Sequence, residues 1–325
     1  MLSGVTILCF AASYAVTLVL EVSRLLFRSG VRGALMLGFA GAGLLAHSAF
    51  LYYRAVENPG SPLSSERDWY LLAAWALVGV YLYLVYYFPR AAFGLFLLPI
   101  VLGLIGAAVL WADPQPYARE PASVVWGTIH GISILLAVVA AAIAFAAGLM
   151  YLSQAYRLKH KRLPRPGLRL PSLEWLQRIN ARAVVVAVLT LGVGVLSGMI
   201  LNRLRQGPAG ETVPWCDPLV LSTQAMFLWL LAALVLAKIS NHVRAGRKVV
   251  YLTVASFVFL IVALGAGLFL NTEHGGSRRQ DEQEGTASNQ LQYKLDAQAS
   301  GSFLKNTSSQ AELAGAPLPA RGGPA

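Results

Sequence analysis

The stretch WGTIHGISILLAVVAAAIAFAAGLMYLSQ, from Trp126 to Gln154, decides the fold of this chain. It contains no charged residue and a single histidine, His130, near its start. A helix needs about 20 apolar residues to cross a membrane, and this stretch is longer than that. The sequence therefore predicts a membrane helix here. The histidine is either satisfied by a polar neighbour or holds a group that needs a nitrogen ligand.

The composition of the whole chain agrees with a membrane location. Of its 325 residues, 56% are hydrophobic and 13% are charged, whereas soluble domains carry about 25% charged residues. We therefore expect an integral membrane protein in contact with lipids. The net charge of +11 would suggest nucleic acid in a soluble protein. Here the basic residues gather in particular loops, so we read them as topology signals and expect no nucleic-acid partner.

Eight apolar segments predict an all-α, polytopic bundle of about eight transmembrane helices over residues 1–270. The third and fourth segments are separated only by FPRAAF, which predicts a tight helical hairpin. The tail, residues 271–325, is polar and rich in Gly, Ser, Gln and Ala, so we expect it to be disordered and external. The predicted segments are 4–23, 33–54, 69–88, 93–112, 123–155, 183–201, 219–239 and 249–270.

The basic residues set the expected orientation. Sixteen Lys and Arg residues lie in the odd-numbered loops and five in the even-numbered ones. Cytoplasmic loops carry the excess of positive charge, so both termini should lie outside and the basic loop 156–182 inside. We expect the protein in the inner membrane of a bacterium.

Two histidines lie inside predicted spans. With this orientation His47 is about 21 Å from the inner boundary and His130 about 10 Å from the outer one, so both fall in the outer third. Intramembrane ionisable residues are functional candidates by default. A neutral histidine can equally bridge two helices, and for His47 both interpretations stay open. Glu21, also within a span, is explained by Arg24 three residues later.

Four stretches of the second half share a pattern, an order and a spacing with a known family. They are IHGISILLAVVAAAIAFAAGLMYLSQAYRLKHK (129–161), LPSLEWLQRINARAVVVAVLTLGVGVLSGMI (170–200), PWCDPLVLSTQAMFLWLL (214–231) and RAGRKVVYLTVASFVFLIVALGAGLFL (244–270). Residues 123–270 thereby resemble the membrane proteins of cytochrome c assembly that handle haem, the CcsA/CcmC/HemX-type group.

The resemblance implies haem binding, transfer or export, with other cytochrome c assembly subunits as partners. His130 matches the first external histidine of the family, and His274 lies near the place of the second, so these two are the expected ligands of the haem iron. Trp215 and Asp217 match the end of the family's tryptophan-rich segment. No aromatic residue lies between Gly198 and Trp215, which favours a HemX-like branch, a membrane regulator of haem synthesis or assembly.

Other features leave further readings open. No motif of an enzyme is present, so we expect no catalytic activity. A small-solute transporter would need charged residues near the midplane or broken helices, and Pro99 is the only candidate break.

The glycines of LGVGVLSG, residues 191–198, lie within a span and predict close helix packing. Cys9 and Cys216 either meet on the outer side or stay unpaired. Arg119, Arg203 and Arg205 either pair with haem propionates or lie at the interface.

Overall fold

In a computed structural model of the protein, the described residues form α-helices, with no β-strand among them. All of them belong to the unit Met1–His274; the second unit is Gly275–Ala325. The predicted tail therefore lies outside the described residues. The structure describes residues 6–24, 31–57, 65–89, 91–114, 124–161, 170–204, 214, 216–239 and 242–269.

The described residues contain eight helices, as the apolar segments predict. They are α1 (Ile7–Ser23), α2 (Arg32–Glu57), α3 (Glu66–Tyr87), α4 (Gly94–Leu110), α5 (Val124–Lys159), α6 (Leu173–Leu204), α7 (Pro218–Ile239) and α8 (His242–Phe269). Five of these, α2, α3, α5, α6 and α7, are long and apolar enough to cross a membrane. The other three contain shorter apolar helices, Ile7–Ser23, Gly94–Leu110 and Val250–Val262.

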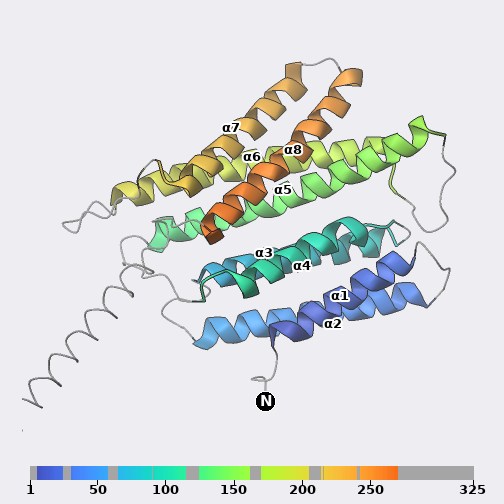
Figure 1. The fold of residues 1–325 in the computed structure, drawn as a ribbon, viewed down its shortest axis with the longest axis horizontal. Coiled ribbons are helices and arrows are strands. Elements are labelled where there is room, and N and C mark those ends of the chain that lie inside the picture. Colours follow the sequence, from blue (N-terminus) through green and yellow to red (C-terminus); the bar gives the residue numbers. More distant parts are fainter. Residues whose placement is uncertain are drawn as a thin grey trace, which may run out of the picture. The chain divides into compact units, whose positions relative to one another are not determined.

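The helices form two rings of four. In the first, α1 packs on α2 and α4, and α3 packs on the same two helices. In the second, α5 packs on α6 and α8, and α7 packs on the same two helices. Helix α5 joins the rings because it also contacts α3 and α4. Figure 1 shows α1 to α4 together and α5 to α8 together, with α5 facing the α3–α4 pair.

The hairpin prediction is confirmed, since α3 ends at Tyr87, α4 begins at Gly94 and the two helices pack on each other. Pro99 lies inside α4 without ending it. Helix α6 contains the predicted span 183–201 and begins ten residues before it, at Leu173. Its first turns are amphipathic: they bury Leu176 and Asn180 and expose charged side chains, so they lack the apolar run on which the prediction depends.

Asn180 ties three helices of the second ring together. Its side-chain Nδ2 donates to the carbonyl oxygen of Ala144 on α5 at 2.7 Å, and Thr253 on α8 donates to its Oδ1 at 3.3 Å. A buried amide is stable only when its polar atoms have partners. These contacts explain why a polar residue lies in the core of an apolar bundle.

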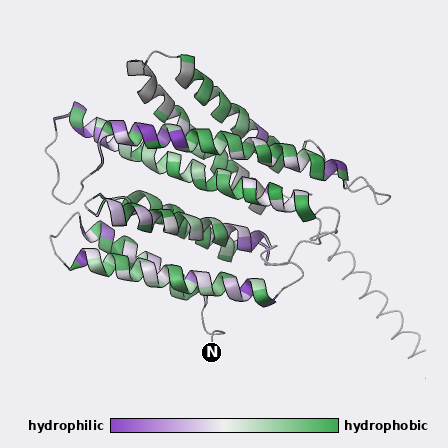
Figure 2. Cartoon of the chain, turned by 180° about the vertical axis from the view of Figure 1, so that it is seen from behind, coloured by the Kyte–Doolittle hydropathy of each residue, from purple (hydrophilic) through white to green (hydrophobic). Residues whose placement is uncertain are grey.

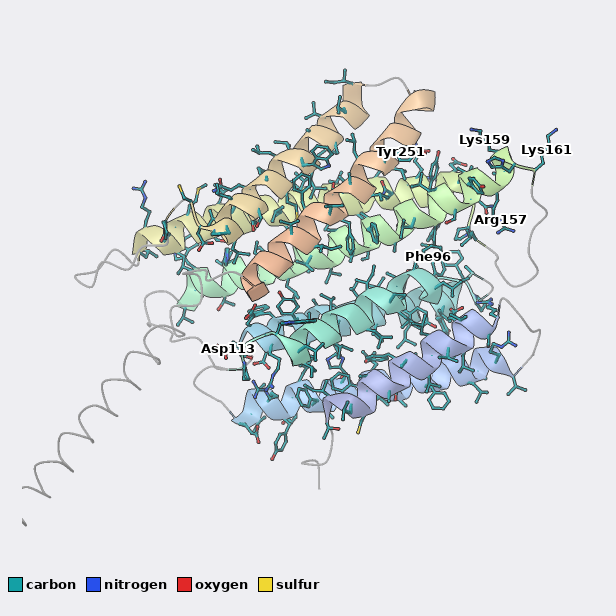
Figure 3. All side chains as sticks on the ribbon, in the orientation of Figure 1. Phe96, Asp113, Arg157, Lys159, Lys161 and Tyr251 are labelled. Atoms are coloured by element: carbon teal, nitrogen blue, oxygen red, sulfur yellow. The ribbon has the colours of Figure 1, made fainter. Side chains whose placement is uncertain are left out.

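Charge is concentrated at the helix ends. Figure 2 shows hydrophobic residues along most of the helices and hydrophilic ones towards their ends, most clearly where α5 ends and α6 begins. Arg157, Lys159 and Lys161 lie at the end of α5, while Asp113 follows α4 at the opposite end of the helices (Figure 3).

Helix α5 has 36 residues, about 54 Å at 1.5 Å per residue. It therefore exceeds a hydrocarbon core of about 30 Å, as its apolar length predicts.

Candidate functional site

His130 lies half-buried on α5, facing α6. Its Nδ1 is 2.8 Å from the backbone carbonyl oxygen of Gly194. A carbonyl oxygen only accepts, so Nδ1 carries the hydrogen and donates it. In the neutral imidazole this leaves the lone pair on Nε2. A backbone carbonyl that fixes the tautomer and the ring orientation is the usual support of a metal-ligating histidine.

Glycines of α6 allow the imidazole to lie this close. A Cβ atom on Gly198 would lie 2.9 Å from Cε1 of His130, and one on Gly194 would lie 2.7 Å from Cδ1 of Ile134. Gly192 faces the other way, towards Phe227 of α7. The prediction that the glycines of residues 191–198 serve helix packing is thereby confirmed. Two of them form a groove for one face of α5, a spacing typical of closely packed membrane helices.

The surroundings of His130 include residues that the sequence did not indicate. Trp69 of α3 packs on Gly131, where a Cβ atom would lie 2.7 Å from the indole ring. Val125, Ile129 and Ile132 form an exposed apolar stripe on a different face of α5 from His130. Because Trp69 precedes His130 by 61 residues, only the packing of α3 on α5 reveals its place.

His47 lies in a different interface, between α2 and α1. It is fully buried, its Nδ1 is 3.3 Å from the hydroxyl of Tyr14, and its ring stacks on Phe10 with the centroids 4.0 Å apart. The packing partners of α2 are α1 and α3, so the structure does not bring His47 against His130. The stacked Phe10 covers one face of the imidazole. His47 therefore fits a bulky planar ligand less well than His130 does.

The remaining residues that the family resemblance implied are placed only in part. Asp217 precedes α7 and caps it: its Oδ1 accepts from the backbone N–H groups of Leu219 and Val220 at 2.8 and 3.4 Å. Pro218, the first residue of α7, suits that position because it needs no hydrogen-bond acceptor for a backbone N–H. This capping accounts for the Asp-Pro pair by local structure alone. Trp215 and His274 lie outside the described residues.

Two other predictions concern the cysteine and arginine side chains. Cys9 and Cys216 are both exposed and both are free thiols, which agrees with the unpaired reading. Arg203 is exposed near the end of α6, whereas Arg119 and Arg205 lie outside the described residues. The described residues include no group of three or more His, Cys, Asp and Glu side chains that could hold a metal ion. A haem needs only one or two protein ligands, so this finding does not bear on it.

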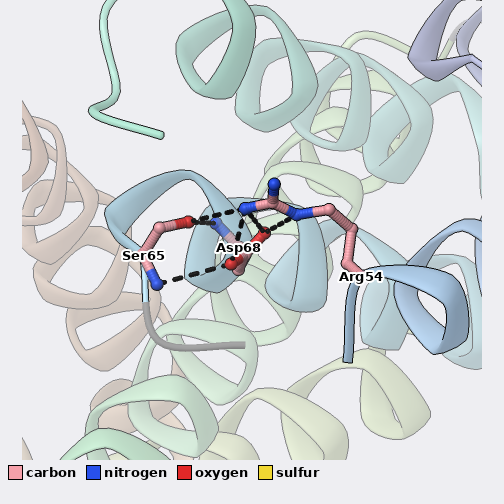
Figure 4. A network of polar contacts seen from close by, with 3 residues as sticks. All are labelled: Arg54, Ser65 and Asp68. Carbon is pink, nitrogen blue, oxygen red and sulfur yellow. Dashed lines mark hydrogen bonds and ion pairs between the residues drawn. The ribbon is translucent and has the colours of Figure 1, made fainter. Parts of the chain in front are cut away.

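Two ion pairs fasten the first ring near its two ends. At one end, Arg54 donates to both carboxylate oxygens of the buried Asp68 at 3.1 Å, and Ser65 and Asp68 form a capping box at the start of α3. Figure 4 shows the guanidinium of Arg54 facing the Asp68 carboxylate with Ser65 beside it. Bidentate pairs of this kind are the strongest form of the interaction.

At the other end, Glu21 is fully buried and lies 3.5 Å from Arg24, which confirms the pair expected three residues apart. Arg24 also donates to the carbonyl oxygens of Pro89 and Ala91, at 2.8 and 3.2 Å. It thereby attaches α1 to the turn between α3 and α4. Gly94, the first residue of α4, is required here, because a Cβ atom on it would lie 2.6 Å from Cγ of Glu21.

The chain is thus an all-helical protein with several helices that are apolar and long enough to cross a membrane. In comparisons with known proteins, no protein-family model, no curated protein and no solved structure matches it. The resemblance to the cytochrome c assembly proteins therefore stays a prediction.

Proposed function

We propose that the protein binds haem at the outer side of a bacterial inner membrane and assists cytochrome c assembly by holding or transferring it. The observation that carries the proposal is the hydrogen bond from Nδ1 of His130 to the Gly194 carbonyl. It fixes Nε2 as the nitrogen with the lone pair, the form in which imidazole serves as an axial ligand of haem iron. The identification of the ligand as haem comes from the family resemblance.

In this proposal each residue has a defined part. His130 supplies the first nitrogen ligand, and the Gly194 carbonyl holds its ring. His274 is the proposed second ligand, because His47 lies between α1 and α2, away from His130. Bound haem would supply an iron centre whose ligation these imidazoles control.

The membrane arrangement that the proposal requires has eight spans, with both termini outside. Helices α1 and α4, with 17 residues each, reach the lower limit of about 17 residues for a spanning helix. Exposed aromatic residues mark the helix ends, where membrane–water interfaces are rich in tyrosine and tryptophan. They are Tyr52 and Tyr53 near the end of α2, Tyr86 and Tyr87 at the end of α3, and Trp111 after α4.

The test is the visible absorption spectrum of the protein purified from membranes in detergent. We expect a Soret band from bound haem in the wild type. His130→Ala should lose the band or shift it, and added imidazole should restore part of the spectrum by occupying the same position. An interhelical hydrogen bond in a membrane contributes only about 0.6 kcal/mol, so the variant should still fold and accumulate.

His160→Ala is the matched control. His160 is an exposed histidine just after α5, and its replacement should leave the haem content unchanged. The proposal is wrong if the wild type carries no haem after growth with haem supplied. His130 is a packing residue if His130→Ala carries as much haem as the wild type with the same spectrum.

A further inference from the structure

The buried face of α1 is polar although the helix lies in an apolar bundle. Its four buried residues are Phe10, Tyr14, Thr17 and Glu21, and none of them has any exposed surface. They are spaced three or four residues apart, so they form one stripe along the helix. The stripe faces α2, α3 and α4, because its members contact His47, Tyr81 and Gly94 on those helices. Three of its four members carry an oxygen into the middle of the first ring.

At one end of the stripe, Tyr14 meets His47. The tyrosine hydroxyl and Nδ1 of His47 are 3.3 Å apart, so one donates to the other. Nε2 of His47 is buried and, among the described residues, has no hydrogen-bond partner. If Nδ1 carries the hydrogen, Nε2 is a buried acceptor without a partner among the described residues. If Nε2 carries it, Nε2 is a buried donor without one. A buried polar atom of this kind requires an explanation, such as an ordered water or an ion.

At the other end, Glu21 meets Tyr81 of α3. The phenol and the carboxylate interact electrostatically, and both residues are fully buried. Oε1 of Glu21 and the hydroxyl of Tyr81 form no hydrogen bond of regular geometry among the described residues, and the two groups are polar neighbours of each other. Oε2 of Glu21 faces Arg24. These atoms of His47, Glu21 and Tyr81 lie on three different helices of the first ring, which among the described residues also buries Nε of Arg67 without a hydrogen-bond partner.

The two ends of the stripe lie about two helical turns apart. Tyr14 and Glu21 are seven residues apart on α1, about 10 Å along the helix axis. Thr17 lies between them, its hydroxyl donating to the Ser13 carbonyl at 2.8 Å. Two or three waters cover such a distance, and buried waters are found where several polar groups lack partners.

We propose that His47, Tyr14, Thr17, Tyr81 and Glu21, together with bound water, form a path that conducts protons through the first ring. These side chains are the buried polar path. Chains of Glu and His within membrane helices are characteristic of proton relays. Beyond its two ends lie charged groups: Arg54, seven residues after His47 on α2, pairs with Asp68, and Arg24 lies three residues after Glu21. This activity is independent of haem binding at His130, which belongs to the second ring.

Proton transfer along the path balances without any electron transfer. A proton that binds Nε2 of His47 allows Nδ1–H to pass its proton to the oxygen of Tyr14. Tyr14 then releases its own hydroxyl proton to water beside Thr17. Each step breaks one N–H or O–H bond and forms another, until the proton reaches the carboxylate of Glu21 next to Tyr81. The reverse sequence moves a proton the other way.

The test measures proton flux into liposomes that contain the purified protein. A pH-sensitive dye is trapped inside, and a potassium gradient with valinomycin sets a voltage that draws protons inwards. We expect the wild type to acidify the interior faster than protein-free liposomes do. Glu21→Gln and Tyr14→Phe keep the shape of their side chains but remove the proton-accepting carboxylate and the relaying hydroxyl. Both should reduce the flux to that of protein-free liposomes.

Two control variants change the same residue types outside the path. Glu174→Gln alters an exposed carboxylate on α6, and Tyr83→Phe alters an exposed tyrosine on α3; both should conduct as the wild type does. Size-exclusion chromatography shows whether each variant is folded before it is reconstituted. The proposal is overturned if wild-type flux equals that of protein-free liposomes. It is also overturned if folded Glu21→Gln and Tyr14→Phe conduct at the wild-type rate.

Discussion

Replacing Gly198 by alanine tests the packing of His130 on α6. The added methyl group would lie 2.9 Å from Cε1 and 3.0 Å from Nδ1 of His130, closer than carbon atoms approach each other without strain. The imidazole has to move away from α6. Because Nδ1 is held 2.8 Å from the Gly194 carbonyl, that movement also breaks the hydrogen bond that orients the ring.

Three contributions set the size of the effect on the free energy of unfolding. Overpacking by one methyl group costs about 1–3 kcal/mol. The lost interhelical hydrogen bond costs about 0.6 kcal/mol. The higher helix propensity of alanine offsets these costs by about 1 kcal/mol. We therefore expect Gly198→Ala to lower the free energy of unfolding by about 1–3 kcal/mol.

The matched control is Gly103→Ala on α4. A Cβ atom on Gly103 has no atom within 4 Å, so this substitution should stabilise the protein through helix propensity alone, by about 1 kcal/mol. Unfolding by SDS in mixed micelles, followed by circular dichroism, measures both variants. The same preparations give the haem content, which should fall in Gly198→Ala and stay unchanged in Gly103→Ala.

A double variant identifies the cause. In a His130→Ala background the added methyl group no longer meets an imidazole, so Gly198→Ala should cost little there. The difference between the two backgrounds is the interaction free energy of the pair. The reasoning is refuted if Gly198→Ala is as stable as Gly103→Ala, or if it is equally destabilising with and without His130.

Three further predictions test other contacts. Asp68→Ala leaves the largely buried guanidinium of Arg54 without its carboxylate and should lower the free energy of unfolding by about 3 kcal/mol. Glu174→Ala removes one partner of an exposed pair and should lower it by less than about 0.5 kcal/mol. Similar costs for the two variants would contradict this interpretation. Gly94→Ala should destabilise the protein by about 1–3 kcal/mol, because its methyl group collides with Glu21, and unchanged unfolding in SDS would be the opposite result. A reporter that is active only in the cytoplasm, fused after Ala325, should be silent; activity there would invert the orientation.

The sequence was sufficient for the helices because their signal is local. An apolar run of about 20 residues predicts a membrane helix wherever it occurs, so eight helices and the α3–α4 hairpin could be placed. The start of α6 could not, because Leu176 and Asn180 lie on a single buried face of an otherwise charged segment. Hydropathy averaged over a window of residues does not detect such a face, because the charged residues on the other faces of the helix lower the average.

The candidate site was predictable only in part. A histidine inside an apolar helix drew attention to His130, and the glycine spacing of residues 191–198 indicated a close helix contact. Nothing in the sequence joined the two, because His130 and Gly194 are 64 residues apart and meet only when α5 packs on α6. The same holds for Trp69, which reaches Gly131 from another helix. Packing between helices decides such pairs, and a single sequence contains no local signal for it.

The burial of Glu21 has a consequence for how the protein is made. Its carboxylate meets Gly94, which follows it by 73 residues in the chain. A ribosome adds about 5–20 residues per second, so roughly 4–15 s pass before α4 can cover this carboxylate. A charged side chain left in lipid for that time is costly. Arg24, three residues later at the end of α1, can pair with the carboxylate during that time, and α4 covers the pair when the first ring closes.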